Sequence, residues 1–212
     1  MIGVMVIGFF ALYLLISVFV VGGVVGWAKR NNRRKWFWGG ITAFLLYNLI
    51  FWDFVPTLLA HKYYCETEAG FWVYKTPEQW KSSLGGKAEN LIPFGKTIEQ
   101  MPLVVINPGT DSAIGVRKVN ERVYKAFDIR EIDNIFPIQK QTTYFADFDG
   151  KEKLAELIDF SSGYGNPMTT GGILGFKSWL SRDGCDSAVM YQEKSKYEQY
   201  LNNLIALGAE HD

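Results

Sequence analysis

The sequence predicts a two-helix transmembrane hairpin followed by an α+β extracytoplasmic domain built on an antiparallel sheet. Three observations lead there: apolar residues crowd the first 60 of the 212 positions, a cluster of cations divides that region in two, and an Asp-Gly pair separates two strand-like segments further on. We place the domain boundary between residues 60 and 61. The whole chain has no net charge, which argues against a generally basic nucleic-acid-binding protein.

Two apolar stretches predict the anchor. Residues 1–28 contain no charged side chain, and a helix of about 20 apolar residues crosses a bilayer. The second stretch begins at residue 36 and continues through Asp53 to residue 60, so the predicted spans are 1–28 and 36–60. No basic residue precedes the first stretch, and its apolar run exceeds the roughly 7–15 residues of a signal peptide, so we expect a retained anchor.

The loop between the stretches, residues 29–35, predicts the topology. Its cations are Lys29, Arg30, Arg33, Arg34 and Lys35. Short loops rich in Lys and Arg stay in the cytoplasm, so both termini and the main domain are expected on the other side, which in a bacterium is the periplasm at the inner membrane. Contact with anionic lipids explains these cations more simply than nucleic acid does, so the expected partners include the lipid bilayer but no nucleic acid.

Small residues are expected to face each other near this loop, because they let membrane helices approach closely. They are Gly22, Gly23, Gly39 and Gly40. Further along, Ser17 and Asn48 lie at similar depth, so the sequence allows a hydrogen bond between them.

Asp53 is the only acid before residue 61. A helix rises 1.5 Å per residue, so Asp53 lies about 25 Å from Trp36 and close to the outer headgroups. We expect an interfacial anchor or a partner for Lys62; a functional intramembrane carboxylate is the alternative.

The outer domain, residues 61–212, carries several local signals. Residues 71–74 predict a strand, and Thr76 followed by Pro77 and Gln79 predicts a capped helix. A short strand is expected over 103–106.

An Asp-Gly pair at 149–150 predicts a hairpin with arms 142–148 and 151–160. Residues 120–132 should pair with the first arm to complete a three-stranded meander. We expect a fourth strand over 174–180, and an amphipathic helix over 191–207 because apolar residues recur there at helical spacing.

The two cysteines, Cys65 and Cys185, both lie in the predicted outer domain, so we expect a disulfide between them. Two free thiols, or a metal pair assisted by His61, are the alternatives. Neither His61 nor His211 has a recognisable setting for a general base, and we predict no catalytic residue, no metal and no cofactor.

The glycine-rich segment 161–172 lacks the lysine of a phosphate-binding loop, so a flexible loop is expected. Loops of this kind often carry binding residues. The candidates are Ser161, Ser162, Tyr164, Asn166 and Thr169. Nearby, Asp147, Asp149 and Asp159 have the alternation of a solvated sheet face; paired catalytic carboxylates are the rival interpretation.

Three segments, 52–57, 61–66 and 69–76, together with 158–163, resemble a family of uncharacterised small inner-membrane proteins of Gram-negative bacteria. The resemblance supports the compartment and implies no activity. We therefore predict a non-enzymatic binding or scaffold protein of an envelope complex, with another envelope protein as its partner. The alternatives are a self-protection factor against toxins or phages, and a membrane-tethered enzyme that uses the 161–172 loop.

Overall fold

The computed structural model describes residues 2–85, 91–95, 103–105, 115–132, 136–148, 152–165, 172 and 174–209. The chain forms two compact units. The first combines Met1–Leu58 with Tyr164–Trp179, and the second combines Leu59–Gly163 with Leu180–Asp212. Each unit is described by itself below.

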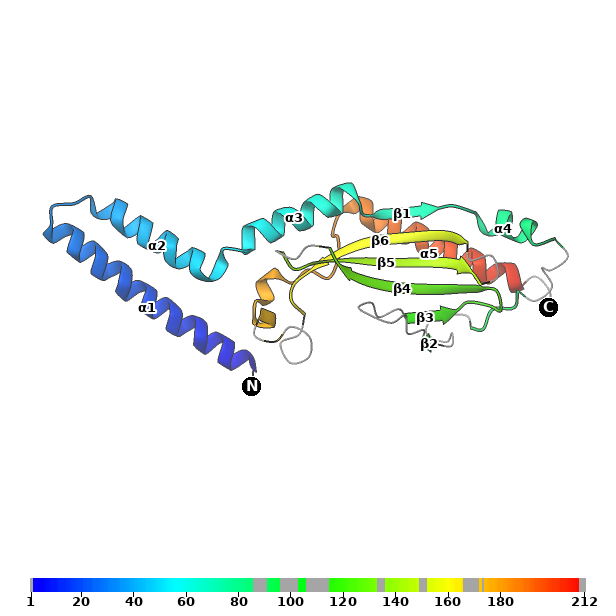
Figure 1. Cartoon of the computed structure of the whole chain (residues 1–212), viewed down its shortest axis with the longest axis horizontal. Coiled ribbons are helices and arrows are strands. Elements are labelled where there is room, and N and C mark those ends of the chain that lie inside the picture. Colours follow the sequence, from blue (N-terminus) through cyan, green and yellow to red (C-terminus); the bar gives the residue numbers. More distant parts are fainter. Residues whose placement is uncertain are drawn as a thin grey trace. The chain divides into compact units, whose positions relative to one another are not determined.

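Helices α1 (Ile2–Arg30) and α2 (Lys35–Phe51) form most of the first unit (Figure 1). By length and composition α1 could cross a membrane, and its large apolar side chains are exposed, Phe19 by 78%. Exposed apolar surface on this scale is typical of a membrane or partner contact rather than of a surface in water.

The second apolar stretch is not one continuous helix, contrary to the sequence prediction for 36–60. After α2 ends, the chain turns through Trp52 and Asp53 and begins α3 (Phe54–Thr67) at a bend of 54°. Pro56 explains the break, because proline lacks the N–H that would bond to the carbonyl of Trp52 and its ring crowds the preceding turn. The pair α2–α3 reaches the length of a span only if both bent parts are counted together.

Aromatic residues line the contact between α1 and α2. Trp27 meets Trp38 with ring centroids 5.8 Å apart, and the Tyr13 hydroxyl donates to the carbonyl of Leu46. Gly39 is buried so closely against Val25 that an added Cβ would lie 2.8 Å from its Cγ2.

At the other three predicted contact glycines, Gly22, Gly23 and Gly40, an added Cβ would have no atom of the described residues within 4 Å beyond its own surroundings in the helix. One glycine therefore makes the close approach that the sequence assigned to four. Ser17 and Asn48 form no hydrogen bond with each other in the described part of the chain; each donates to a carbonyl one turn back in its own helix.

A six-stranded antiparallel sheet forms the second unit within the described residues, with strand order β1-β6-β5-β4-β3-β2 (Figure 1). The strands are β1 (Gly70–Val73), β2 (Leu103–Val105), β3 (Gly115–Lys118), β4 (Val123–Glu131), β5 (Ile138–Asp147) and β6 (Lys153–Ser162). The predicted meander is confirmed as β4, β5 and β6, and the residues at the β5–β6 turn, 149–151, lie outside the described part.

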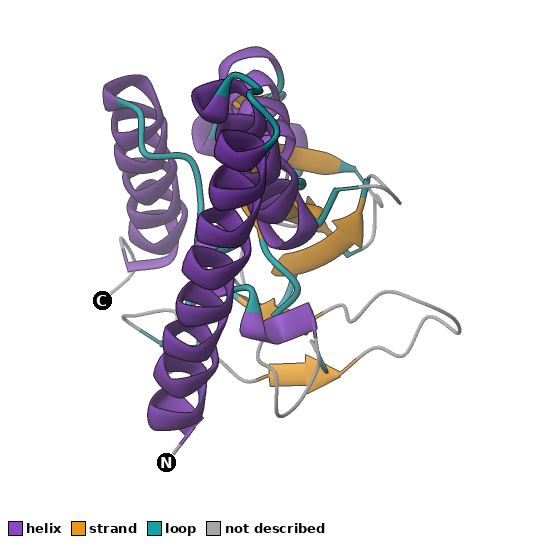
Figure 2. Ribbon diagram, turned by 90° about the vertical axis from the view of Figure 1, so that its left-hand side faces the viewer, coloured by secondary structure: helices purple, strands orange, loops and turns teal. Residues whose placement is uncertain are grey.

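Two helices pack on one face of this sheet, α4 (Pro77–Ser83) and α5 (Ala188–Ala209). The predicted cap of α4 is confirmed: Thr76 accepts from the Gln79 N–H, and the Gln79 side chain accepts from the Thr76 N–H. In Figure 2, α5 lies to one side of the strands. The core between helix and sheet contains Trp80, Val119, Val123, Phe145, Leu154, Tyr197, Tyr200 and Leu204.

The prediction of a strand over 174–180 is wrong. This segment forms two 3₁₀ turns, η3 (Leu174–Phe176) and η4 (Ser178–Leu180). Its apolar residues suggested a strand, but its backbone bonds locally, with the Lys177 N–H donating to the Leu174 carbonyl at 3.0 Å. A short apolar run does not by itself distinguish the two conformations.

Candidate functional site

The face of the sheet opposite α5 carries charged and aromatic side chains. Successive side chains of a strand point to opposite faces, so Phe145 of β5 enters the α5 core while Tyr144 points to the other side. Register then places Glu156 of β6 opposite Tyr144, and Asp128 of β4 opposite Thr142. We name this face, defined by the alternate positions Asp128, Thr142, Tyr144 and Glu156 and their neighbours, the open face.

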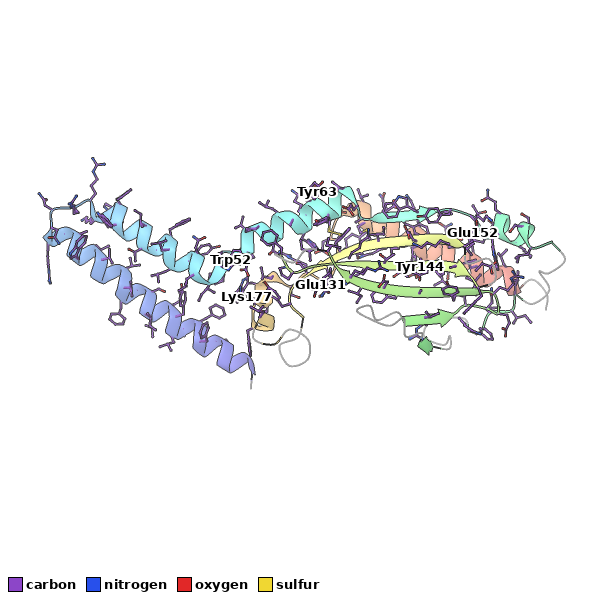
Figure 3. The ribbon with its side chains drawn as sticks, viewed as in Figure 1. Trp52, Tyr63, Glu131, Tyr144, Glu152 and Lys177 are labelled. Carbon is purple, nitrogen blue, oxygen red and sulfur yellow. A yellow bond between two sulfur atoms is a disulfide. The ribbon has the colours of Figure 1, made fainter. Side chains whose placement is uncertain are left out.

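A hollow of about 320 Å³ lies on the open face. Its lining residues are Asp128, Arg130, Lys140, Thr142, Tyr144, Lys153, Glu156 and Ile158. They come from the three strands of the meander, and Figure 3 labels Tyr144 among the side chains of these strands. Three cations and two carboxylates line the hollow, so the lining has one cation more than it has carboxylates; Lys140 also lies 3.8 Å from Glu68, which is outside the lining.

Asp128 is the most buried charged group on this face, with 7% of its surface exposed. One of its oxygens, Oδ2, accepts from Nε of Arg130 at 2.7 Å, while Oδ1 has no hydrogen-bond partner among the described residues. Burial, followed by the charge of Asp128, raises the pKa of the neighbouring Tyr144 hydroxyl. Tyr144 is therefore a neutral hydrogen-bond donor at neutral pH.

Glu156 accepts two hydrogen bonds, from Nζ of Lys153 at 2.7 Å and from the Tyr74 hydroxyl at 2.8 Å. Burial by itself would raise the pKa of Glu156, but these hydrogen bonds and the charges of Lys153 and Lys140 outweigh it and lower the pKa. The carboxylate is consequently ionised at neutral pH and fixes both donors in place. The same bond raises the pKa of Tyr74.

Lysines and aromatic rings alternate across the open face. Lys153 lies 5.0 Å from the ring centroid of Tyr144, and Lys118 lies 5.3 Å from that of Phe148. The ring of Tyr124 is 4.6 Å from Phe148 and 6.4 Å from Tyr144. Such a surface can hold an anionic group beside a flat or ring-shaped one, because lysines neutralise the charge and the rings supply stacking area.

Helix α3 limits the open face at one end. Tyr64 stacks on Phe160 with ring centroids 5.3 Å apart. Lys140 stands at the border, over the ring of Phe160 and with its Nζ 3.8 Å from Glu68. The hollow therefore begins where the cover from α3 ends.

The predicted disulfide between Cys65 and Cys185 is present, with Cα atoms 5.5 Å apart. It joins α3 to the segment that precedes α5. The backbone N–H of Cys185 donates to Asp159 Oδ1 at 2.9 Å, and Lys194 of α5 pairs with Asp159 Oδ2 at 2.8 Å.

The sequence suggested that Asp147 and Asp159 lie on a solvated face of the sheet. The structure differs, because these residues are only 5% and 9% exposed. The indole N–H of Trp80 donates to Asp147 at 2.9 Å, so this carboxylate satisfies a core side chain. Both aspartates serve structural bonds, and Asp149 lies outside the described residues.

Asp53 is fully buried within the first unit and pairs with Lys177 at 2.5 Å. The expected pair with Lys62 is wrong: Lys62 lies 3.7 Å from Glu66. The segment Tyr164–Trp179 belongs to the first unit and supplies Lys177. Lys177 is 124 positions from Asp53 in sequence, so no local pattern could indicate this ion pair. Figure 3 labels Lys177 and Trp52.

The residues of the predicted binding loop are not gathered in one loop. Ser161 and Ser162 belong to β6, where Ser161 accepts from Gln141 and Ser162 donates to the carbonyl of Leu180. Tyr164 lies in the first unit, with its ring 5.9 Å from Nζ of Lys177. The remaining two candidates, Asn166 and Thr169, lie outside the described residues.

Sequence reasoning missed the residues of the hollow. The available signal was the alternation of charged or hydroxyl-bearing side chains at positions 142 and 144 within the predicted arm 142–148, and at position 140 just before it. Comparison with known proteins adds no assignment, since no family model, no curated protein and no solved structure matches the chain. The functional conclusion therefore rests on the geometry.

Proposed function

We propose that the chain is a membrane-anchored extracytoplasmic binding protein, without enzymatic activity, that holds an anionic part of another envelope protein on the open face of its sheet. The observation that carries this proposal is the 320 Å³ hollow, in which three cations and two carboxylates surround Tyr144. An excess of cations favours an acidic partner, and the fixed carboxylates restrict which acidic partner fits.

The anchor in this proposal is α1 together with the bent pair α2–α3 as two spans. The length and apolar surface of α1 support it. The cations of residues 29–35 lie at the end of α1, in the connecting turn and at the first residue of α2, which supports a cytoplasmic loop. The second unit then faces the periplasm from the inner membrane.

Reporter fusions test this topology in a Gram-negative host. Alkaline phosphatase joined after residue 212 is expected to be active, because that enzyme folds only outside the cytoplasm. The same enzyme joined within residues 29–35 is expected to be inactive. The reverse pattern of activities contradicts the proposed orientation.

A binding role suits the hollow better than catalysis does. The described residues of its lining include no histidine, cysteine or serine. The carboxylates of Asp128 and Glu156 are engaged by Arg130, Lys153 and Tyr74, which hold them as fixed charges. Fixed charges of both signs provide recognition without a group poised to transfer a proton.

Site-specific photo-crosslinking in cells tests the proposed surface. A photoreactive phenylalanine at position 144 is expected to capture a partner. The matched control is position 191 on α5, where Tyr191 is 64% exposed on a different element. Arg130→Glu should abolish the adduct formed at 144, because it reverses a charge at the rim. Equal capture from 191, or an adduct at 144 that survives Arg130→Glu, contradicts the proposal.

A further inference from the structure

A histidine and two cysteines meet at the disulfide. His61 and Cys65 lie one turn apart on α3, and Cys185 approaches from the segment before α5. One ligand atom from each, the two Sγ atoms and a ring nitrogen, lie within 4.8 Å of one another. A single imidazole beside two sulfur atoms is a ligand set for thiophilic metal ions.

The hydrogen bond of His61 determines which ring nitrogen can bind a metal. Nε2 lies 3.0 Å from the carbonyl oxygen of Phe160. A carbonyl can only accept, so Nε2 is the donor in this contact, and Nδ1 is the nitrogen that offers its lone pair when the ring is neutral. Metal-binding histidines characteristically donate their second ring nitrogen to a carbonyl or carboxylate, which fixes the ring and increases its basicity.

The surroundings hold the three side chains in place. His61 is 8% and Cys185 2% exposed, while Cys65 is half-buried. Cys65 Sγ lies 3.9 Å from Nδ1 and 3.7 Å from Nε2 of His61. Asp159 of β6 accepts a hydrogen bond from the backbone N–H of Cys185 and so holds this residue in place. Cys65 is thus the more exposed of the two cysteines.

We propose that reduction of the disulfide converts His61, Cys65 and Cys185 into a binding site for one thiophilic d¹⁰ cation, Zn²⁺ or Cu⁺. A dithiol reductant supplies two electrons and two protons: the Cys65–Cys185 bond breaks, two thiols form, and the reductant becomes a disulfide. Binding of the ion then releases the thiol protons. This inference is independent of the function proposed for the open face.

The geometry agrees with this ligand set. Zinc bonds of about 2.3 Å to sulfur and about 2.0–2.1 Å to nitrogen, in a tetrahedron, place ligand atoms roughly 3.5–4 Å apart. Cys65 Sγ lies 3.9 Å from Nδ1 and 3.7 Å from Nε2, so its separation from either ring nitrogen is within this range. The protein supplies three ligands, which leaves the fourth position for water or a thiol. The oxidised chain, in which the sulfurs are bonded to each other, cannot bind the ion in this way.

The test uses the full chain in detergent micelles, oxidised or reduced with a phosphine and desalted without oxygen. Co²⁺, a coloured substitute for Zn²⁺, is titrated into both forms. The reduced chain is expected to bind one ion, with thiolate-to-cobalt charge-transfer absorption that Zn²⁺ abolishes, and the oxidised chain none. A separate titration with Cu⁺ against a chromogenic chelator shows which of the two d¹⁰ ions binds more tightly.

Two variants and one control complete the test. Cys65→Ser combined with Cys185→Ser should abolish the charge-transfer band, and His61→Ala should weaken binding by at least about 10- to 100-fold, the loss found when even an outer partner is removed. His211→Ala is the matched control and should bind like the wild type. Circular dichroism verifies that each chain is folded.

Several results would overturn the proposal. They are a reduced wild-type chain that binds no Co²⁺, one that loses its fold on reduction, and binding that persists in the double serine variant. Wild-type affinity in a folded His61→Ala chain would exclude the histidine and with it the assigned site.

Discussion

The face of the sheet that α5 covers and the open face both present aromatic rings, but in opposite environments. Phe145 is fully buried on the covered face and stacks on Tyr197 of α5 at 5.3 Å. Its neighbour in sequence, Tyr144, lies half-buried on the open face beside Lys153. Burial strongly raises the pKa of Tyr197, whereas Tyr144 is affected by both burial and the charge of Asp128. One strand therefore supplies stability on one side and a polar surface on the other.

The carboxylates repeat the contrast. Asp147 is buried, accepts a hydrogen bond from the indole N–H of Trp80, and forms an ion pair with Arg122 at 3.6 Å. Asp128 of the open face has an oxygen, Oδ1, that forms no hydrogen bond within the part of the chain that the structure describes. A buried polar group without a partner costs free energy, so such a group is tolerated mainly where it serves something other than stability. Within the described residues, the two carboxylates therefore differ in how completely their oxygens are hydrogen-bonded.

The largest expected loss of stability comes from a substitution on the face of the sheet that α5 covers. Phe145→Ala should lower the free energy of unfolding by about 3–5 kcal/mol, because it leaves a cavity between the sheet and α5. Tyr144→Ala should lower it by less than about 1 kcal/mol, because its ring is half-exposed. Urea unfolding of the full chain in detergent measures both. Equal losses for the two variants would contradict the division between the faces.

Removal of the disulfide should cause the second-largest loss of stability. It connects residues separated by 120 positions, and loss of a native disulfide typically costs about 2–5 kcal/mol. Cys65→Ser combined with Cys185→Ser, and the reduced wild type, should show the same decrease in urea midpoint. The disulfide lies outside the hydrophobic core between the sheet and α5. That core remains intact without the bond, so the double variant is expected to stay folded. A decrease confined to the variant would assign the effect to the serines and not to the missing bond.

Local chemistry explains which parts of the fold were predictable. The Thr76–Gln79 cap, the meander and the C-terminal helix follow from residues close together in sequence, and the structure has all three. The disulfide was also predictable, since only one pairing of two cysteines exists. These features need no knowledge of distant contacts.

Features that depend on distant partners could not be predicted. The pair of Asp53 with Lys177 spans 124 positions, and the open face exists only because three strands align in one register. The bend before α3 was indicated by Pro56, yet the apolar composition around it favoured a continuous helix. From Asp53, just before α3, and along that helix, side chains that can form polar contacts recur every four residues at Asp53, Thr57, His61 and Cys65. That spacing was the neglected signal.

A smaller change in stability is expected when either of two buried aspartates, Asp147 and Asp128, is replaced. Asp147→Ala should cost about 1–3 kcal/mol, because the indole N–H of Trp80 loses its acceptor inside the core. Asp128→Ala removes an oxygen that has no partner and one ion pair to the exposed Arg130, a contact worth about 0–1 kcal/mol. Its stability should therefore hardly change while partner capture from position 144 is lost. A large destabilisation by Asp128→Ala would show that the open face is structural after all.

The smallest expected effect concerns Glu156 and pH. Its pKa in the folded chain is lowered, so the ionised carboxylate stabilises the fold above its unfolded pKa of about 4.3, and this contribution is lost as the pH falls through the folded value. Glu156→Gln cannot titrate, so the stability difference between wild type and variant should be constant from neutral pH down to about pH 5 and shrink below it.

Lys153→Met sharpens this last comparison, because Lys153 donates to Glu156 and lowers its pKa. Without that charge the folded pKa rises toward the unfolded value, so less pH-dependent stability is left to lose, and the loss ends at a higher pH. Urea midpoints measured for the three chains across the acidic range decide the matter. A wild-type curve parallel to that of Glu156→Gln at every pH would mean that Lys153 and Tyr74 do not hold the ionised carboxylate, and the open face would then lack one of its two fixed negative charges.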